Sequence, residues 1–451
     1  MSTLPTDTTS SAPQPDSETL ISDVSAPDVL PSDILPSDIL IVGAGPAGAT
    51  ISLFLSQAKI PHTIIDKATF PRDKADGNVY GTKVIEVLDT LSLDYFPELM
   101  SQVDTFLGCD TAQIFTPNGN RFNLRFPHLS AGEKTTVTEA QTVRDEGKDA
   151  PCFTMNRRDF DHFLVKKLDE TYADQRFGTS LKTVEKPDDQ GRWQITLETN
   201  GETTTISPKL VVAADGANST FLKAVGVQIP DQRCYDTVQG YFRGVTGFED
   251  TPAGQYFHFE GHFLPECTPG FFFVVPLANN IFNVGIGKPR CDVQKQNTDL
   301  TQLLEDIMHS HPQFAERFAH AEPVGDWRPW PITAAGTDQA PISGNGYLAV
   351  GDAAGLSMPL AYFGTGNAMI SGMIAAQQIQ QFVNQQQFDA ATLAAYDRAI
   401  YNKLQKEFQV AMLARSFLKQ NWLFNLISSS TFVKSVFRRS FKKTSPLLKK
   451  L

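Results

Sequence analysis

A glycine-rich segment near the amino-terminal end has the spacing of a phosphate-binding turn. It consists of Gly43, Ala44, Gly45, Pro46, Ala47 and Gly48. A short apolar run ending near Val42 precedes it, and a stretch with helical periodicity starting near Pro46 follows. In such a turn the first glycine permits the tight bend, the second lets the backbone approach a pyrophosphate, and the third lets the helix pack on the strand. The helix N-terminus adds N–H dipoles that favour an anion.

A carboxylate stands where a nucleotide ribose would lie. A second strand-like run, from His62 to Ile65, is followed by Asp66, which lies 18 residues after Gly48. Its oxygens can accept hydrogen bonds from ribose hydroxyls. Strand, turn, helix, strand and acid in this order predict a dinucleotide-binding unit.

Two later segments also place an acid directly after an apolar strand. In the first, the run from Leu210 to Ala214 leads into Asp215, and an ordinary Asp-Gly turn is the plain alternative. In the second, the strand from Tyr347 to Val350 leads into Gly351 and Asp352. After it, Gly364-Thr-Gly366-Asn367 opens a small-residue helix that runs to about Val383. An acid after a strand, with a glycine-rich helix start, could hold phosphate, sugar and ring oxygens of the same ligand.

These segments resemble, in order and spacing, those of the FAD-dependent oxidoreductases related to para-hydroxybenzoate hydroxylase, and within them the geranylgeranyl reductase family. The resemblance covers about residues 38 to 400. It includes Phe70-Pro71-Arg72-Asp73-Lys74, Arg157 with Phe160 and Asp161 in an R-x-x-F-D pattern, A-D-G-A-N-S, and G-D-A-A-G followed by F-G-T-G-N-A. It implies an α/β fold with a discontinuous Rossmann-type FAD-binding domain, a mixed β-sheet substrate domain and a C-terminal helical tail.

The resemblance also implies roles for single residues. Beyond the glycine turn, it assigns to the FAD site Asp66, Lys67, Arg72, Gly77, Arg157, Asp215, Gly351, Asp352, Gly364, Gly366 and Asn367. Asp66 would hold the adenosine ribose, Arg157 would lie along the FAD, and Asp352 would bind the ribityl and diphosphate region. Backbone N–H groups at Gly366 and Asn367 would face the pyrimidine edge of the isoalloxazine, where reduction places negative charge.

The middle of the chain carries the segment most specific to the reductases. The run F-F-F-V-V-P-L-A-N-N-I-F-N-V-G-I-G looks like their lipid-pocket motif, with Phe271, Phe273 and Pro276 in the substrate-binding places and Gly285 and Gly287 following. A buried β-hairpin is the structural alternative. A tryptophan-halogenase interpretation is weaker, because Trp327-Arg-Pro-Trp330 does not have the W-x-W-x-I-P spacing of that family.

The sequence departs from the reductases after the P-R-x-K run. They commonly carry Cys-Gly-Asp there, and this chain has Asp76-Gly77-Asn78. A carboxylate in place of a thiol changes both polarity and proton affinity. No catalytic residue is assigned: the candidate proton donors Tyr241, His258, His262 and Tyr362 lie near predicted pocket segments, but a lone Tyr or His is commonly structural.

The preferred hypothesis is hydride transfer from reduced flavin to a carbon-carbon double bond of a hydrophobic small-molecule or lipid substrate. NAD(P)H or another electron donor would reduce the flavin transiently, since the chain has no second G-x-G-x-x-G after a strand. One alternative is a flavin monooxygenase that hydroxylates an aromatic or polyketide substrate. The other is a non-catalytic flavin-binding interaction protein.

Composition narrows the class further. The net charge of −11 disfavours nucleic acid as a partner, and five scattered cysteines without a C-x-x-C or metal-ligand spacing predict neither disulfide redox chemistry nor a metal site. No run approaches the ~20 apolar residues of a membrane span, and the amino-terminal segment lacks the features of a signal peptide. The expected compartment is the cytoplasm.

The two ends of the chain differ in charge. Residues 1–37, with no Lys or Arg and a repeated L-P-S-D-I, are expected to form a disordered acidic leader. From Ala411 onward there is no acid, and the basic residues are Arg415, Lys419, Lys434, Arg438, Arg439, Lys442, Lys443, Lys449 and Lys450. A basic amphipathic helix from about Phe432 would suit peripheral contact with an anionic membrane; packing on the protein body is the alternative.

The predicted domain order follows from these segments. Residues 38–234 form the first part of the FAD-binding domain, with a substrate-lobe insertion at about 100–150. Residues 235–335 form the substrate domain and 336–400 the second part of the FAD-binding domain. Residues 401–451 form C-terminal helices with the basic tail.

Overall fold

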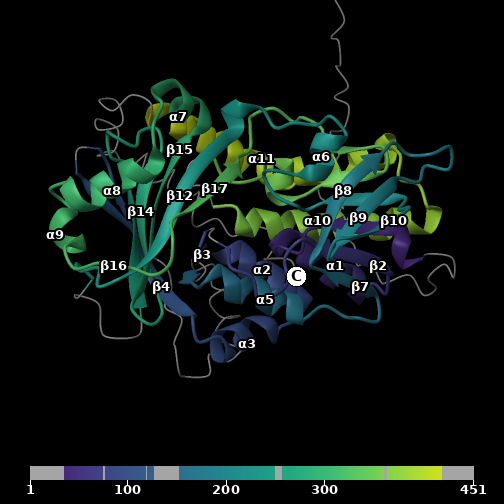
Figure 1. Cartoon of the computed structure of the whole chain (residues 1–451), viewed down its shortest axis with the longest axis horizontal. Helices are drawn as coiled ribbons and strands as arrows, with labels where there is room; N and C mark the ends of the chain where they lie inside the picture. Colours follow the sequence, from purple (N-terminus) through teal and green to yellow (C-terminus); the bar gives the residue numbers. More distant parts are fainter. Residues whose placement is uncertain are drawn as a thin grey trace, which may run out of the picture.

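The computed structural model describes residues 35–74, 77–117, 119–125, 152–248, 256–359 and 363–418. Within these ranges the chain forms two lobes that share a continuous apolar core (Figure 1). The predicted leader up to residue 34, Asp76, Tyr362 and the basic residues from Lys419 onward lie outside the described residues.

The first lobe is built on a six-stranded sheet, which is parallel except for its short edge strand β18. Its strands lie in the order β18 (Ser343–Gly344), β19 (Tyr347–Ala349), β11 (Leu210–Ala213), β1 (Ile39–Val42), β2 (His62–Asp66) and β7 (Ala173–Phe177). The central strands are buried on both faces and are accordingly continuous apolar runs.

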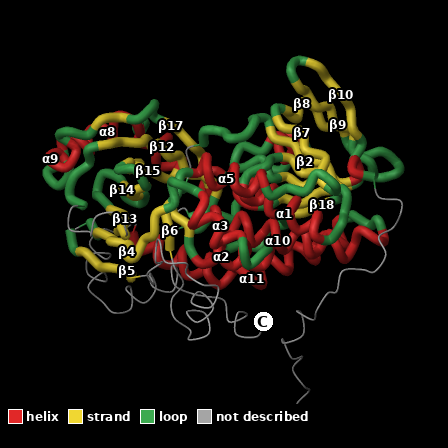
Figure 2. The backbone as a smooth tube through the Cα atoms, turned by 90° about the horizontal axis from the view of Figure 1, so that it is seen from below, coloured by secondary structure: helices red, strands yellow, loops and turns green. Residues whose placement is uncertain are grey.

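Helices cover one face of this sheet, and a small three-stranded sheet stands on the other side (Figure 2). The helices of this lobe are α1 (Pro46–Gln57), α2 (Thr82–Leu91), α3 (Tyr95–Gln102), α5 (Arg157–Lys166), α6 (Thr220–Ala224), α10 (Thr365–Phe382) and α11 (Ala390–Leu418). The small sheet is formed by β8 (Thr179–Glu185), β9 (Gln194–Thr199) and β10 (Glu202–Ile206). Helices α1 and α10 pack closely, since a Cβ at Gly372 would lie 2.6 Å from the Ala47 carbonyl oxygen.

The second lobe is built on a ten-stranded mixed sheet. In spatial order its strands are β16 (Glu322–Pro323), β12 (Cys234–Arg243), β15 (Ile281–Pro289), β14 (Phe271–Leu277), β13 (Tyr256–His262), β4 (Leu107–Phe115), β6 (Cys152–Thr154) and β3 (Val79–Tyr80), with β17 (Arg328–Thr333) on β12 and β5 (Arg121–Arg125) on β4. One face packs on α7 (Arg290–Gln296), α8 (Leu300–Ser310) and α9 (Ala315–Phe318). The other face is turned towards the first lobe.

Much of the predicted element order is confirmed. The strand runs predicted to end near Val42 and to span residues 62–65, 210–214 and 347–350 are β1, β2, β11 and β19, the run from Phe271 forms β14, and the small-residue helix is α10. The next helix, α11, buries an apolar stripe completely: Leu393, Tyr396, Ile400, Leu404 and Phe408. No helix in the described part of the chain is long and apolar enough to cross a membrane. The same residues contain no cluster of three or more His, Cys, Asp or Glu side chains that could hold a metal.

Candidate functional site

The register of the six-stranded sheet explains why three distant segments meet. Ala349 pairs with Ala213, Ala213 with Val42, and Val42 with Ile65. These strands are parallel, so their carboxyl ends lie along one edge of the sheet. In open α/β sheets this edge is where ligands bind. The glycine turn, Asp66, Asp215 and Asp352 therefore follow neighbouring strands at one site.

The glycine turn leaves no space for side chains at its first and last positions. Gly43 has a φ of +105°, and a Cβ there would lie 2.5 Å from the Ala214 carbonyl oxygen. A Cβ at Gly48 would lie 1.8 Å from the Gly43 carbonyl oxygen. Gly45 differs, because its nearest neighbour is an Arg72 guanidinium nitrogen at 3.4 Å from the Cβ position. The turn is thus packed tightly on the sheet, while its middle glycine faces the Arg72 side chain.

A chain of alternating charges runs from the turn to α5. Asp66 accepts hydrogen bonds from the Ala44 N–H at 2.9 Å and from Arg72 Nη1 at 3.0 and 3.2 Å. Arg72 Nη2 donates to Asp161 Oδ2 at 3.1 Å, and Arg157 Nε donates to Asp161 Oδ1 at 2.9 Å. Arg157 and Asp161 are 2% and 1% exposed, so this pairing compensates charges that are buried away from solvent.

The pKa of Asp161 reflects that environment. Burial acts to raise the pKa, but the positive charges of Arg157, Arg72 and Lys74 outweigh it and leave the pKa below its ordinary value. Asp161 is therefore an anion between two guanidinium groups. Arg157, predicted to lie along the cofactor, is linked to Arg72 through the shared carboxylate of Asp161. Of these three charged residues, Arg72 is the one that lies over the glycine turn. Lys67 is exposed directly after Asp66.

Asp215 lies beside the turn with one oxygen available. Its Oδ2 accepts from the Thr220 N–H at 2.7 Å at the start of α6. Its Oδ1 is buried without a partner among the described residues. Burial raises the pKa of this carboxyl, and hydrogen bonds from Ser219, Thr220 and Phe221 act in the opposite direction. A buried oxygen without a partner next to a phosphate-binding turn fits a hydroxyl donor of a bound ligand.

The start of α10 closes the opposite side of the site. Gly351 has a φ of +57°, and a Cβ there would lie 3.1 Å from the Ala368 Cβ. Asp352, in the 3-10 turn Gly351–Ala354, accepts a 2.6 Å hydrogen bond from Ser357 Oγ. A Cβ at Gly364 would lie 2.2 Å from the same Ser357 oxygen. Glycine at this position therefore keeps the helix start close to the acid turn.

A lysine that the sequence reasoning missed sits at this helix start. Lys83 Nζ, from α2, donates to Asn367 Oδ1 at 2.6 Å and to Glu407 Oε2 at 2.5 Å. Asn367 is 3% exposed and also donates through Nδ2 to the Leu356 carbonyl at 2.8 Å. A Cβ at Gly366 would lie 2.9 Å from the Lys83 Cβ. A positive charge is thus held one hydrogen bond away from the N-terminus of α10.

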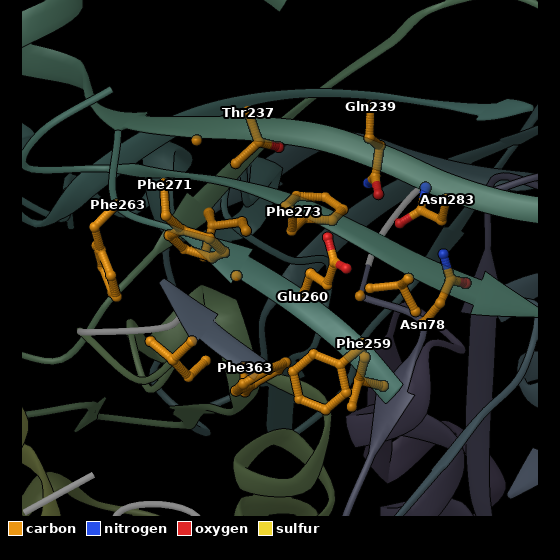
Figure 3. A pocket seen from close by; sticks show the side chains of 17 residues that line it. Asn78, Thr237, Gln239, Phe259, Glu260, Phe263, Phe271, Phe273, Asn283 and Phe363 are labelled. Carbon is orange, nitrogen blue, oxygen red and sulfur yellow. The ribbon is translucent and has the colours of Figure 1, made fainter. Parts of the chain in front are cut away.

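A cavity of about 840 Å³, including the space at its open mouth, adjoins this helix start. Gly77, Asn78 and Val79 line it from one side, and Phe363, the residue before Gly364, lines it from another. Most of the remaining wall is one face of the ten-stranded sheet. Figure 3 shows phenylalanines gathered along one part of the wall and Thr237, Gln239, Asn283 and Asn78 along another.

The reductase-like segment contributes one face of a β-hairpin to this cavity. Phe271 and Phe273 line it, whereas Pro276 does not, because alternate residues of β14 point to opposite faces of the sheet. Pro276 instead accepts a 2.7 Å hydrogen bond from Thr154 Oγ1 through its carbonyl. Pro276, which was predicted to bind substrate together with the two phenylalanines, therefore lies outside the lining of this cavity. A Cβ at Gly285 would lie 2.4 Å from the Phe273 ring, so the glycine provides the seat for that ring.

The candidate proton donors are only partly brought to the cavity. His258 and His262 hydrogen-bond to Glu260 at 3.3 and 2.9 Å, and Arg317 binds the same carboxylate at 2.8 Å. Burial would raise the pKa of Glu260, but the two histidines and Arg317 hold it well below its usual range. The His262 ring contacts Phe314 on the helix-covered face of the sheet, away from the cavity.

Tyr241 is the candidate that stays near the cavity. It is 8% exposed and pairs across the sheet with Asn283, and its hydroxyl lies 3.5 Å from Asn78 Nδ2. Sequence reasoning missed Phe259, Phe263, Gln239 and Asn283, which also line the cavity. The sequence marks these residues only through the alternation of side chains between the two faces of a strand, and the strand boundaries were not known.

The residues of the cradle fit a flavin dinucleotide. The glycine turn, whose space Cβ atoms would fill, suits the two phosphates. Buried Asp66 at the ribose position and the unpartnered Asp215 oxygen suit hydroxyl groups. The sheet edge, the α10 start and the aromatic cavity follow one another, so a long cofactor can extend from the first lobe to the cavity.

Comparison with known proteins agrees with this site. The family described as "FAD binding domain" matches residues 36–400. The digeranylgeranylglycerophospholipid reductase of Methanosphaerula palustris is 25% identical over 365 residues, 80% of each chain. The conditioned medium factor receptor 1 of Dictyostelium discoideum is 22% identical over 385 residues, 84% of this chain and 70% of the receptor.

Solved structures share the fold at lower identity. A geranylgeranyl bacteriochlorophyll reductase-like protein from Thermoplasma acidophilum has a TM-score of 0.72 and 18% identity, covering 90% of this chain and 96% of its own. A flavin-dependent brominase has a TM-score of 0.69 and 20% identity, covering 90% and 92%. With a family match over most of its length and a cradle of matching chemistry, the chain belongs to the FAD-binding-domain family of oxidoreductases, with FAD as its cofactor.

Proposed function

We propose that the protein reduces a carbon-carbon double bond of a prenyl or other lipid-like substrate. The observation that carries the proposal is the cavity, which places the phenylalanines Phe259, Phe263, Phe271, Phe273 and Phe363 next to the start of α10. The reductase named among the relatives acts, by its name, on a digeranylgeranyl lipid. An apolar enclosure of this kind suits a hydrocarbon chain better than a charged metabolite.

The residues of the chain contribute binding and exclusion of water. When bound, reduced FAD supplies the hydride to one carbon of the double bond, and the neighbouring carbon must take up a proton. The aromatic wall holds an apolar substrate against the α10 start. This contact fixes the distance and orientation between the double bond and the cofactor. The Phe273 ring packs directly on Gly285, where any side chain would displace it. This part of the wall is therefore already formed before a substrate binds. NAD(P)H or another electron donor would bind transiently from outside.

An anaerobic single-turnover experiment tests the proposal. FAD-loaded protein is reduced photochemically under argon and mixed with geranylgeranyl lipid. The expected result is return of the oxidised flavin absorbance together with a product that gains two hydrogens per turnover by mass spectrometry. Reoxidation that requires oxygen and yields a hydroxylated product would instead identify a monooxygenase. Neither reaction, with FAD still bound, would favour an interaction protein.

Two neighbouring phenylalanines provide a matched test of the cavity. Phe273→Leu is expected to raise KM for the lipid about fivefold with little change in melting temperature, because the lost ring faces the cavity. Phe272→Leu removes a ring that is fully buried on the helix-covered face. It should leave KM unchanged and lower the free energy of unfolding by about 1 kcal/mol or more. The reverse pattern would show that the substrate lies elsewhere.

Lys83 is expected to tune the flavin through Asn367. Reduction adds negative charge near the α10 start, and a nearby cation contributes about 1 kcal/mol, or roughly 20 mV for a two-electron couple. Lys83→Met should therefore make the midpoint potential of bound FAD about 20 mV more negative. Lys403→Met is the control, since Lys403 links α11 to Glu86 of α2 at 3.1 Å without contacting Asn367. Equal shifts in both variants would contradict a specific role for Lys83.

Peripheral membrane contact is proposed from the sequence alone. The basic residues from Lys419 onward would bring a lipid-metabolising protein to an anionic membrane surface. They lie outside the described residues, so peripheral membrane contact remains part of this proposal.

A further inference from the structure

The cavity wall formed by β12, β15 and β14 consists of three rows of paired residues. The first row is Thr237, Gly287 and Phe271, the second Gln239, Gly285 and Phe273, and the third Tyr241, Asn283 and Val275. Each row runs from a polar side chain on β12 to an apolar one on β14. Because side chains alternate along strands, all nine positions share the cavity face. The polar side chains thus follow β12 and β15, and the phenylalanines follow β14; Figure 3 shows Thr237, Gln239 and Asn283 along one border of the cavity.

Asn283 directs a hydrogen-bond acceptor without a partner into this face. The residue is 1% exposed, and its Nδ2 donates to the Gly240 carbonyl at 3.3 Å. A carbonyl can only accept, so the nitrogen must face Gly240 and the oxygen must be the other atom. Asn283 Oδ1 has no partner among the described residues. A buried acceptor of this kind is costly unless a ligand or a water molecule supplies a proton donor.

Gln239 adds a second side-chain amide whose hydrogen-bonding groups have no partner among the described residues. It is 4% exposed and lines the same cavity, and its side-chain amide makes no hydrogen bond to another described residue. It lies one row from Asn283 on the neighbouring strand, and the position between them, Gly285, carries no side chain. Thr237 differs, because its hydroxyl already donates to the Trp330 carbonyl at 2.6 Å.

The polar side of the cavity carries no available charge among its described lining residues. Glu260 is the only ionisable residue among the described residues that line the cavity, and its carboxylate is bound by Arg317 and two histidines. A phosphate or carboxylate placed here would find no cation in the described wall, and a buried unpaired charge is strongly unfavourable. The group recognised at this side is therefore uncharged.

We infer that the carboxamides of Gln239 and Asn283 bind a hydroxyl group, so that the substrate is an unsaturated lipid-like alcohol. The hydroxyl donates to Asn283 Oδ1 and accepts from the Gln239 amide, while the chain lies on the phenylalanine side. This inference rests on the proposed function for the reaction, but it concerns binding alone and names a feature that a plain hydrocarbon chain lacks. It deepens the proposal by specifying which prenyl compounds fit.

Equilibrium binding to the oxidised, FAD-loaded protein tests the inference without turnover. The ligands are geranylgeraniol and geranylgeranial, which share a chain but differ in that only the alcohol can donate a hydrogen bond. Binding is followed by the perturbation of the flavin absorbance. The alcohol is expected to bind about tenfold more tightly than the aldehyde, since the aldehyde leaves the Asn283 oxygen unsatisfied. Equal dissociation constants in the wild-type protein would overturn the inference.

Three variants separate the roles of the polar residues. Asn283→Leu is expected to reduce the alcohol-to-aldehyde ratio to about one, whereas Gln239→Leu should weaken both ligands by a similar factor. Thr237→Val is the matched control, and it should keep the tenfold ratio because that hydroxyl is already paired. A ratio that stays at ten in Asn283→Leu would overturn the inference. Bound flavin and circular dichroism confirm that each variant is folded.

The inference and the proposed function can fail separately. A protein that prefers the alcohol but never reduces its double bond supports the inference and contradicts the proposed function. A protein that reduces geranylgeranyl compounds but binds the alcohol and the aldehyde equally contradicts the inference alone.

Discussion

Replacing Gly48 with alanine is expected to produce protein that purifies without FAD. The new Cβ would lie 1.8 Å from the Gly43 carbonyl oxygen and 3.2 Å from the Ala214 Cβ, so the helix must move away from the turn. Such a shift costs about 3 kcal/mol or more, which corresponds to a loss of at least ~100-fold in affinity for FAD. The ratio of absorbance at the flavin band to that of the protein, followed by titration with FAD, measures the effect.

Gly81→Ala is the matched control for this substitution. Gly81 precedes α2 with a φ of −126°, and nothing lies within 4 Å of its Cβ position. The control should keep wild-type flavin content. If Gly48→Ala also kept it, the close contact between turn and helix would not be the basis of dinucleotide binding.

Asp161→Asn is expected to lower the free energy of unfolding by about 3–5 kcal/mol. The substitution removes the anion that Arg72 shares with Arg157, which is 2% exposed, so both guanidinium groups lose a charged hydrogen-bond partner. Urea unfolding of the protein before and after addition of FAD measures the loss. Arg72 should also become less well ordered over Gly45, so FAD binding should weaken in the same variant.

An exposed ion pair provides the comparison. Arg176 and Asp174 lie 2.6 Å apart, with side chains that are 37% and 38% exposed. Asp174→Asn should cost less than about 1 kcal/mol, because solvent screens such pairs. A similar loss in both variants would contradict the importance of burial in the Asp161 network.

The same network gives the sign of a pH effect. The pKa of Asp161 is lower in the folded protein than its ordinary value of 3.8, so the unfolded chain binds the proton more readily. The stabilisation is complete above pH ~3.8 and is lost as the pH falls below that value towards the lowered pKa. Wild-type protein should therefore lose stability more steeply than Asp161→Asn in this acidic range.

The FAD-binding lobe could largely be predicted from the sequence because its signals are local. Gly43, Gly48 and Asp66 have fixed spacings, and each requirement arises within one strand-turn-helix unit. The segments around Asp215 and Asp352 could be assigned to the cofactor site through their resemblance to the FAD-dependent oxidoreductases. Their meeting at one sheet edge became visible only with the register of β1, β11 and β19.

The cavity was harder to predict, since it depends on which face of each strand is turned inwards. Pro276 and Phe273 belong to one motif but point to opposite faces of β14. His258 and His262 similarly alternate with the cavity residues Phe259 and Gly261 of β13, and both histidines hydrogen-bond to Glu260. An error of one residue in strand phase exchanges the two faces. Lys83 and Asn367 are 284 positions apart in the chain, and no local pattern connects them.

Helix α11 contacts both lobes. Its 29 residues extend about 43 Å, from contacts with β18 in the first lobe to Arg415, whose guanidinium lies 4.8 Å from the Tyr235 ring in the second. Opening the lobes like a hinge would bend this rod or break that stacking contact. Ligand exchange is therefore expected to proceed by small rearrangements around the mouth of the cavity, with the scaffold staying rigid through the reaction cycle.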